Sequence, residues 1–496
     1  MMSRVRGVAA LACAFASLVA TSVVHAGAGW FESGDTQLRL DLQLLNDAEI
    51  IRYPISQWPV PRAGLQYAIA NAKEHLATSA AVQAALERVR ARLEPSAGAR
   101  FSAALHAGEA GLLRDFDSIA REQGEITGGF DYSSGRFAVG LDVTLVADSD
   151  DGQEVRGDGS HLTAQFGNWL LSANTLERWW GPGHDSSLIL SNNARPMPTL
   201  MVERAEARPF ASRWLSWLGP WRFNIALSEM EQHREDIDRP MFMAWRVAIM
   251  SLKDMEIGFS RTAQFCGKGL RCTASSFLDL LIGNDNPGFD ATPESEPGNQ
   301  MAGFDLHWAS PIGNAPYALY GQYIGEDESG YLPAKYLGQL GLEAWRPFAR
   351  GGVLQGFVEY ANTTCSGMSG GRPRYDCAYT QGKFDVEGYR YRDRVIGHTT
   401  DSDAESVALG GTFADARGAV WSATARHARL NHDGVDPRNT VSAVPAEYSA
   451  LELGWRGRWL GHSLAIELGV EALDPELGDR NTEPYGFIGW RYDFDR

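Results

Sequence analysis

The sequence predicts a mainly β protein, a transmembrane antiparallel β-barrel of about 18 strands with a small N-terminal periplasmic helical module. Three observations lead to this fold class. After position 125, segments of about ten residues alternate apolar with small or acidic residues. A secretory signal opens the chain. No later segment has the roughly 20 consecutive apolar residues that a membrane helix needs. An exported chain with this pattern is typical of the outer membrane of a diderm bacterium.

Residues 1–26 have the three parts of a secretory signal peptide. Arg4 and Arg6 form a basic start, residues 8–24 form an apolar stretch, and Val24-His25-Ala26 resembles a cleavage site. The whole chain has a formal charge of −17, and removal of two arginines leaves a mature charge of about −19 (−17 − 2). Such an acidic chain lacks the basic face that nucleic acid requires, so we expect no nucleic-acid partner.

Residues 27–124 differ in texture from the rest and predict the periplasmic helical module. The leucines of 38–44 alternate with polar residues, which favours one short strand. Further on, apolar residues recur at spacings of three and four, and Ser79 is a plausible N-cap. Helices are therefore expected at 63–76, 79–93 and, more weakly, 112–121.

Residues 125–496 are expected to form the outer-membrane barrel. In 137–145, large apolar residues share one face and small or acidic residues share the other. A lipid-facing position cannot carry charge, so Asp142 and Glu467 are expected to point into the lumen. A soluble β-sandwich would show the same alternation. It would not explain the aromatic residues near strand ends, which suit the two membrane interfaces: Trp308, Tyr317, Trp345, Tyr360, Trp455 and Trp490.

The C-terminus and the loop lengths support the barrel and orient it. The last segment, 485–494, has an apolar-aromatic face and resembles the assembly signal of outer-membrane proteins, although Asp495 and Arg496 follow it. With both ends in the periplasm, most short turns fall on the periplasmic side and most long loops fall outside. The turn at 133–135 is the exception. A barrel strand near 100–105 would shift this parity.

Four cysteines follow the signal, and they fall in two close pairs. In an oxidising compartment we expect two local disulfides, Cys266–Cys272 and Cys365–Cys377. A zinc site is the alternative, but no C-x-x-C spacing is present. The acidic run 148–152 has its glycine one place too early for an EF-hand, and 401–405 is a weaker cation candidate. No metal and no cofactor are expected.

Three stretches stand out from the strand pattern: RWWGPGHDSSLILSNNARPMP at 178–198, WLSWLGPW at 214–221 and GYRYRDRVIGH at 388–398. Together they resemble the Wzi family of outer-membrane capsule-assembly proteins, over nearly the whole mature chain. The resemblance implies an 18-stranded barrel, a periplasmic helical bundle and a lectin-like role in holding exported capsular polysaccharide at the cell surface. It brings no catalytic residues with it.

Seven residues of these stretches are candidate glycan contacts, because Trp rings stack on sugar C–H faces and Asn and Arg bond hydroxyl or carboxylate groups. Each has a structural alternative. The two tryptophans could form a constriction inside the barrel, Arg195 could pair with a luminal acid, and the last two arginines could lie on a solvated face. The candidates are Trp179, Trp180, Asn192, Asn193, Arg195, Arg390 and Arg392.

Three functions compete. A surface lectin predicts a blocked lumen, and it would retain polysaccharide through many weak sites. A porin-type channel predicts an open lumen that favours cations. An enzyme is not expected, because the G-x-S-x-G pattern at 367–371 lies in a Gly-rich loop and no spacing pairs His398, His427 or His432 with a serine. The expected partners are surface polysaccharide and the outer-membrane bilayer, with capsule-export machinery or peptidoglycan as candidates for the helices of 63–93.

Overall fold

The computed structural model describes residues 29–494, apart from short gaps. Within that range, the gaps are 95–96, 110, 118, 233, 235–236, 253, 268–271, 274–276, 278–298, 314, 330–331, 366–374, 376, 381–386 and 435–437. The expected signal peptide and the G-x-S-x-G pattern at 367–371 therefore lie outside the described residues. Among the described residues, the helices are too short or too polar for any of them to cross a bilayer.

Eighteen antiparallel strand positions close into one barrel, which confirms the predicted fold class. Two short strands, β7 and β8, share the position beside β6. The wall consists of β4 (Gly98–Ala107), β5 (Gly124–Ser134), β6 (Phe137–Ala147), β7 (Val155–Arg156), β8 (His161–Phe166), β9 (Trp169–Asn174), β11 (Thr199–Arg204), β12 (Trp221–Glu229), β13 (Met241–Leu252), β14 (Met255–Phe265), β15 (Gln300–Ala309), β16 (Tyr317–Ser329), β17 (Leu332–Pro347), β18 (Val353–Asn362), β21 (Glu405–Ala414), β22 (Val420–Leu430), β23 (Ala446–Trp459), β24 (His462–Pro475) and β25 (Asn481–Asp493).

The barrel closes between β25 and β4, where Trp490 lies opposite Ala103. The first barrel strand thus begins at Gly98, and the boundary expected at 125 is corrected to this strand. The sequence pattern of β4 is weak because small residues occupy much of it. Once β4 is counted, the β5–β6 turn lies at the same barrel end as the other short turns, so the exception to the loop rule disappears.

The outward faces of the strands carry the apolar residues that a lipid environment requires. Leu141 of β6 is 56% exposed and Leu468 of β24 is 61% exposed. On the opposite face of β6, the buried Asp142 pairs with Arg100 inside the barrel, as expected for a luminal acid. Of the aromatic residues assigned to the interfaces, Trp345 is wrong, because it is buried against the helical core at the barrel end.

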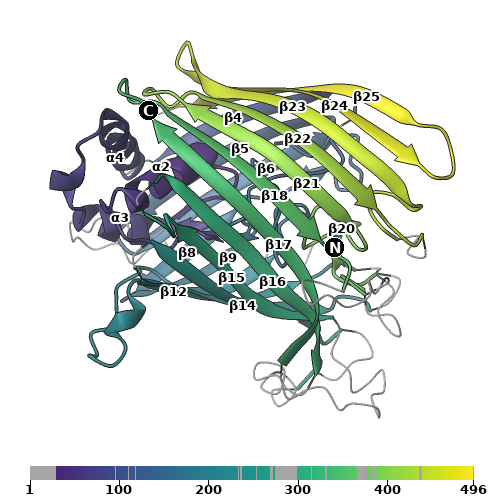
Figure 1. Ribbon diagram of the computed structural model, residues 1–496, viewed down its shortest axis with the longest axis horizontal. Helices are drawn as coiled ribbons and strands as arrows, with labels where there is room; N and C mark the ends of the chain where they lie inside the picture. Colours follow the sequence, from purple (N-terminus) through teal and green to yellow (C-terminus); the bar gives the residue numbers. More distant parts are fainter. Residues whose placement is uncertain are drawn as a thin grey trace, which may run out of the picture.

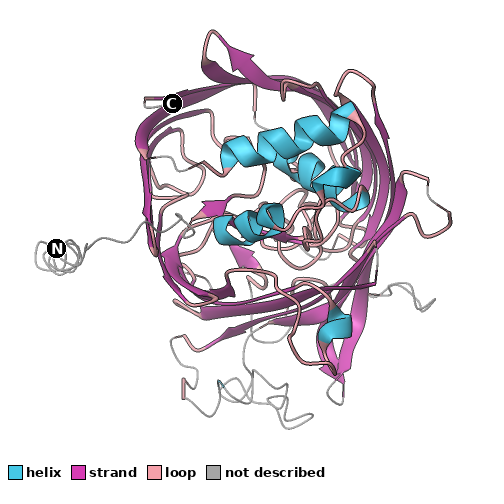
Figure 2. Cartoon of the chain, turned by 90° about the vertical axis from the view of Figure 1, so that its left-hand side faces the viewer, coloured by secondary structure: helices cyan, strands magenta, loops and turns pink. Residues whose placement is uncertain are grey.

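The helices lie inside one end of the barrel, and Figure 2 shows them within the ring of strands. They are α2 (Thr36–Asp47), α3 (Arg62–Ala70) and α4 (Ala80–Arg92), with the short 3₁₀ turn η1 (Glu74–Leu76) between the last two. Ser79 caps α4, as predicted, by accepting a hydrogen bond from the Val82 amide at 3.2 Å. No helix forms at 112–121, which is an irregular connection in the part the structure describes.

The strand expected at 38–44 is wrong, because these residues form α2. Nine consecutive residues of α2, Gln37 to Leu45, are buried. The helix is enclosed by α4 on one side and by the barrel wall on the other, so its leucines need not follow a single 3.6-residue stripe. The alternating leucines therefore reflect burial on all sides rather than a strand.

The helices and most short turns share one end of the barrel, and most long connections share the other (Figure 1). The long β11–β12 connection is an exception and lies at the short-turn end. Both disulfides are confirmed: Cys266 and Cys272 have Cα atoms 4.8 Å apart, and Cys365 and Cys377 have Cα atoms 5.8 Å apart. The pairs follow β14 and β18, so both brace connections at the long-loop end. By the loop rule, this end faces the outside.

Candidate functional site

The lumen is occupied by three stacked layers, which we call the plug. The lower layer is the helical segment 30–93, and the central layer is the β9–β11 connection 175–198. The outer layer is the described part of the segment between β18 and β21, residues 377–380 and 387–404. Small two-stranded pairs link parts of it, including β1 (Trp30–Phe31) with β3 (Val60–Pro61) and β2 (Gln57–Trp58) with β10 (Trp179–Trp180).

The lower layer is tied to the barrel wall by buried polar groups. Arg222 of β12 forms a salt bridge of 2.7 Å with Glu203 of β11 and donates to the carbonyl of Gln57 at 2.5 Å. Glu256 of β14 accepts from the Ile55 amide at 2.8 Å. These contacts occupy inward-facing strand positions, where an unpaired charge would be costly. They hold the lower layer against the wall.

The predicted tryptophan pair lies at the junction of the lower and central layers. Trp179 and Trp180 are both fully buried, and Trp179 pairs in register with Trp58. Phe116 stands edge-on to both Trp58 and Trp179 with ring centroids 5.3 Å away, and Arg39 of α2 lies 4.4 Å from the Phe116 centroid. Both tryptophan side chains are thus covered by other parts of the chain inside the barrel.

The asparagine pair holds the central layer to its neighbours. Asn193 donates to the Val395 carbonyl at 3.0 Å, and both asparagines are 1% exposed. Arg121, from the β4–β5 connection, donates to the carbonyls of Asn192 and Asn193 at 2.5 and 2.6 Å. Sequence reasoning missed Arg121, because nothing in its local sequence indicates which carbonyls it meets. Asn192 and Asn193 therefore connect segments far apart in the chain.

Arg195 pairs with acids, which was the structural alternative for this residue. Its Nε and Nη2 lie 2.8 and 3.0 Å from the two carboxylate oxygens of Asp158, and its Nη1 bonds Asp151. Asp151 belongs to the acidic run that resembled a cation site, and it also pairs with Arg156 at 3.1 Å. The acidic run is thus used in salt bridges.

The outer layer carries Arg390 and Arg392 on the hairpin of β19 (Arg390–Tyr391) and β20 (Arg394–Val395). Arg390 is buried and forms a two-point salt bridge with Asp401, at 2.7 and 3.1 Å. Arg392 lies nearer the surface, 3.6 Å from Asp151. Of the seven predicted glycan contacts, only Arg392 is more than one-tenth exposed; the assignment itself stays a prediction.

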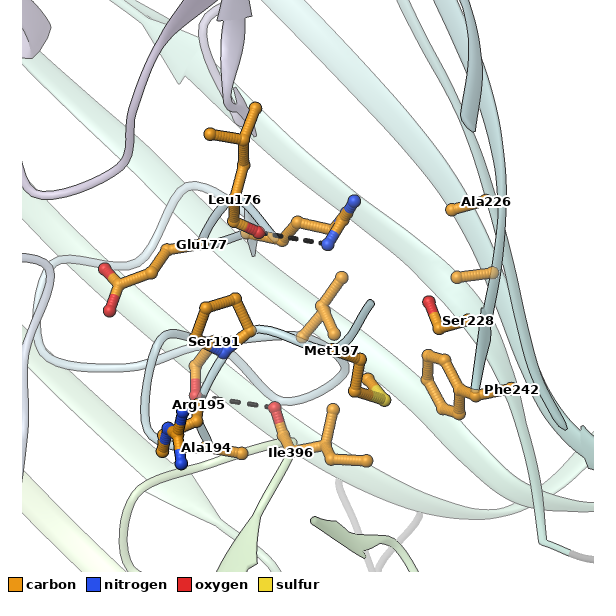
Figure 3. Close-up of a pocket in the computed structure, with 14 residues that line it drawn as sticks. Leu176, Glu177, Ser191, Ala194, Arg195, Met197, Ala226, Ser228, Phe242 and Ile396 are labelled. Carbon is orange, nitrogen blue, oxygen red and sulfur yellow. Dashed lines mark hydrogen bonds between the residues drawn. The ribbon is translucent and has the colours of Figure 1, made fainter. Parts of the chain in front are cut away.

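A small cavity separates the central layer from the wall (Figure 3). Its lining includes Met197, Ala226 and Phe242, with Arg195 at its edge. Its volume of about 20 Å³ is room for a water molecule or two and is too small for a sugar ring. Figure 3 shows Ser191 bonded toward Ile396, which fastens the central layer to the outer layer. A glycan would therefore meet the plug from its outer surface.

Burial changes the titration of two plug histidines. Burial lowers the pKa of His398 to about 4; its Nδ1 lies 2.8 Å from the Thr400 hydroxyl. Burial, reinforced by the nearby Arg39, also lowers the pKa of His184. His398 is therefore neutral at neutral pH, and the closed plug favours that state.

One serine–histidine pair was not foreseen. Across β22 and β23, Nδ1 of His427 lies 3.0 Å from the Ser449 hydroxyl on the outward wall, so the expectation that no histidine meets a serine is wrong for His427. A nucleophile also needs a third group that orients the base. Among the described residues, no hydrogen bond reaches Nε2 of His427. Nor do these residues include a group of three or more His, Cys, Asp or Glu placed to hold a metal ion.

The third distinctive stretch lies away from the plug. Residues 214–220 belong to the β11–β12 connection at the short-turn end, around the 3₁₀ turn η2 (Ser216–Leu218). Trp214 is 85% exposed, and only the stretch's last residue, Trp221, enters the wall. Most of this stretch is therefore exposed and lies outside the three layers of the plug.

Fold and plug together define the class: an integral outer-membrane β-barrel whose lumen is filled by its own chain. The model of the capsule assembly protein Wzi family matches residues 97–483, so the chain belongs to the Wzi capsule-assembly family.

Two relatives agree with this assignment. The solved structure of Wzi from Escherichia coli superposes with a TM-score of 0.82 at 25% identity, covering 95% of this chain and 100% of that one. That protein is described as an outer membrane protein involved in group 1 capsule assembly and as a carbohydrate-binding β-barrel. An uncharacterized 55.8 kDa protein in the cps region of Klebsiella pneumoniae is 31% identical over 339 residues, which are 68% of this chain and 65% of that relative.

Proposed function

We propose that this chain is a lectin-like barrel that anchors exported capsular polysaccharide at the cell surface. The observation that carries the proposal is the plug. Three layers of chain held by buried ion pairs fill the lumen. The long loops at the outer mouth are then suited to binding a ligand rather than to passing one through. The family and the carbohydrate-binding E. coli relative support the same role. The porin-type alternative needs an open lumen, and the plug argues against it.

The role is binding rather than catalysis. Buried carboxylates that resembled reactive or metal-binding groups, such as Asp151 and Asp401, are neutralised by arginines in the plug. Many weak sites on neighbouring barrels would retain one repetitive polymer by avidity, without a covalent step. The helical end and the exposed 214–220 connection face the periplasm in this arrangement, where they are available to the export machinery.

The test is retention of polysaccharide by the purified barrel. The native protein, refolded in detergent and immobilised, should retain capsular polysaccharide extracted from the strain that encodes it. A barrel of the same class without capsule function serves as the control surface. Trp214→Ala is the matched variant, since it removes an exposed aromatic ring at the opposite end and should bind like the native chain. Equal retention on the native and control barrels would overturn the proposal.

A further inference from the structure

Two arginines where the β4–β5 connection meets the plug form no salt bridge within the described residues. Arg114 lies in the β4–β5 connection, and Arg394 begins β20. Among the described residues, neither has a carboxylate oxygen within 4 Å, whereas their neighbour Arg121 pairs with Glu177 at 2.8 Å. In a chain of net charge −17, carboxylates are plentiful. Two guanidinium groups without a carboxylate partner, near enough for the charge of Arg394 to act on Arg114, are therefore a feature that folding alone does not require.

The two side chains are brought together by the β19–β20 hairpin. Nη1 of Arg394 lies 3.4 Å from the carbonyl of Leu112, two residues before Arg114. Arg114 donates from Nη2 to the Ile119 carbonyl at 2.7 Å, but its buried Nε has no hydrogen-bond partner in the described structure. Arg114 is 9% exposed and Arg394 is partly exposed. The pair thus combines an unused buried donor on Arg114 with a partly exposed Arg394.

The charges around the pair give it a positive field. Burial, together with the neighbouring charges of Arg121 and Arg394, lowers the pKa of Arg114 to about 9, while Glu177 and Glu125 oppose the shift. Burial and Arg121 also lower the pKa of Arg394, against the attraction of Asp150 and Glu122. Glu177 and Glu122 are already paired with other arginines. An added anion would relieve this repulsion.

The hairpin that presents Arg394 is held in a strained turn. Its two turn residues, Arg392 and Asp393, have φ angles of 51° and 61°, in the left-handed region that asparagine and glycine prefer in such turns. Glu231 accepts from the Arg392 amide at 2.9 Å, and Arg234 donates to the Arg390 carbonyl at 2.7 Å. The surrounding loop therefore fixes a turn of unfavourable backbone geometry, as is common where a binding group is positioned.

We propose that Arg114 and Arg394, with Arg121 behind them, form a binding site for the carboxylate of an acidic sugar, such as a uronic acid or a pyruvylated residue of the polysaccharide. A guanidinium group binds a carboxylate through two parallel hydrogen bonds, which neutral hydroxyls cannot match. A net charge of −17 repels an anionic polymer overall, so the pair would also select where the polymer docks. This inference rests on the proposed function.

The experiment compares one polysaccharide in two chemical forms. Capsular polysaccharide from the encoding strain is used as extracted and after reduction of its carboxyl groups to alcohols. The native barrel should bind the reduced polymer about tenfold more weakly. Arg394→Gln and Arg114→Gln should each weaken binding of the extracted polymer about tenfold and leave binding of the reduced polymer unchanged. Arg239→Gln, at an exposed arginine of the β12–β13 loop, is the matched control and should bind both forms like the native chain.

The outcomes separate this inference from the function beneath it. Equal binding of both forms by the native barrel overturns the carboxylate site and leaves the lectin role standing. Failure to bind either form overturns the lectin role itself. Because Arg114→Gln could disturb the plug, the variant of the partly exposed Arg394 is the deciding one. Folding of each barrel is checked by comparing the gel mobility of heated and unheated samples. Native-like binding of the extracted polymer by Arg394→Gln also overturns the site.

Discussion

The salt bridge between Arg390 and Asp401 offers a direct test of how the plug is held. Arg390 is 4% exposed and Asp401 is fully buried, and two hydrogen bonds of 2.7 and 3.1 Å join them. The change Arg390→Met keeps the apolar stem and removes the charge. It leaves the Asp401 carboxylate buried beside one partner fewer, while the barrel strands lose nothing.

The magnitude follows from what Asp401 retains. Removing one member of a buried ion pair costs about 3–5 kcal/mol. The carboxylate still accepts hydrogen bonds from Thr440, at 2.9 Å from its amide and 2.8 Å from its hydroxyl, and from the Ser402 amide at 2.7 Å. We therefore expect the lower end, about 3 kcal/mol. This cost falls on local opening of the outer layer, whose open population should rise about 100-fold.

The assay is single-channel recording in a planar bilayer. The native barrel should carry no steady current, and Arg390→Met should show frequent openings. Adding Asp401→Asn to that variant should reduce the openings, because the uncompensated charge is gone. Arg429→Gln, an exposed arginine on β22, is the control and should stay closed. A large steady conductance in the native barrel would refute the plug's role, and equal opening in the single and double variants would refute the charge argument.

Three further predictions concern the plug and its loops. The pKa of His398 is lowered in the folded state, so the unfolded or opened state binds more protons; stability is full above about pH 6.5 and is lost as pH falls toward 4, by about 3 kcal/mol. Hydrogen exchange of 387–400, corrected for intrinsic rates, should therefore increase from pH 7 to pH 5 and change less in His398→Asn; an exchange pattern independent of pH would contradict this. The paired change Cys365→Ala with Cys377→Ala should speed proteolysis of the external loop without altering the heat-modified migration of the barrel, and unchanged proteolysis would show that the disulfide does not restrain this loop. Trp58→Ala should cost about 3–5 kcal/mol of local stability and loosen the lower layer, measured as faster hydrogen exchange of 36–47, with protection equal to the native chain as the contrary result.

The strands of the wall were predictable because the residue type at each position depends on whether that position faces lipid or the lumen. A residue that faces lipid must be apolar, and its neighbour faces the lumen. Apolar residues therefore recur at every second position of short segments such as 137–145. The local disulfides were predictable for a similar reason, since close spacing makes pairing within a loop simple. The first strand, 98–107, was left open as an alternative, because its small residues weaken that period.

The plug was less predictable because its residues contact partners that are far away in the sequence. The alternating leucines of α2 suggested a strand, and only enclosure by the barrel explains a helix buried on all sides. The candidate site shows the same limit. The run at 178–198 was correctly singled out, but Trp179, Asn193 and Arg195 are turned toward Phe116, Val395 and Asp158, residues 37 to 202 positions away.

The sequence by itself thus determined that the chain is an outer-membrane barrel of the capsule-assembly type, because lipid imposes its pattern residue by residue and the distinctive runs are long. Only the tertiary structure decided which charged groups form the salt bridges that close the lumen and which form none. Salt bridges between segments far apart in the chain carry no local signature, so the use of Arg390 by Asp401 and the unneutralised pair of Arg114 and Arg394 appear only once the barrel brings its loops together.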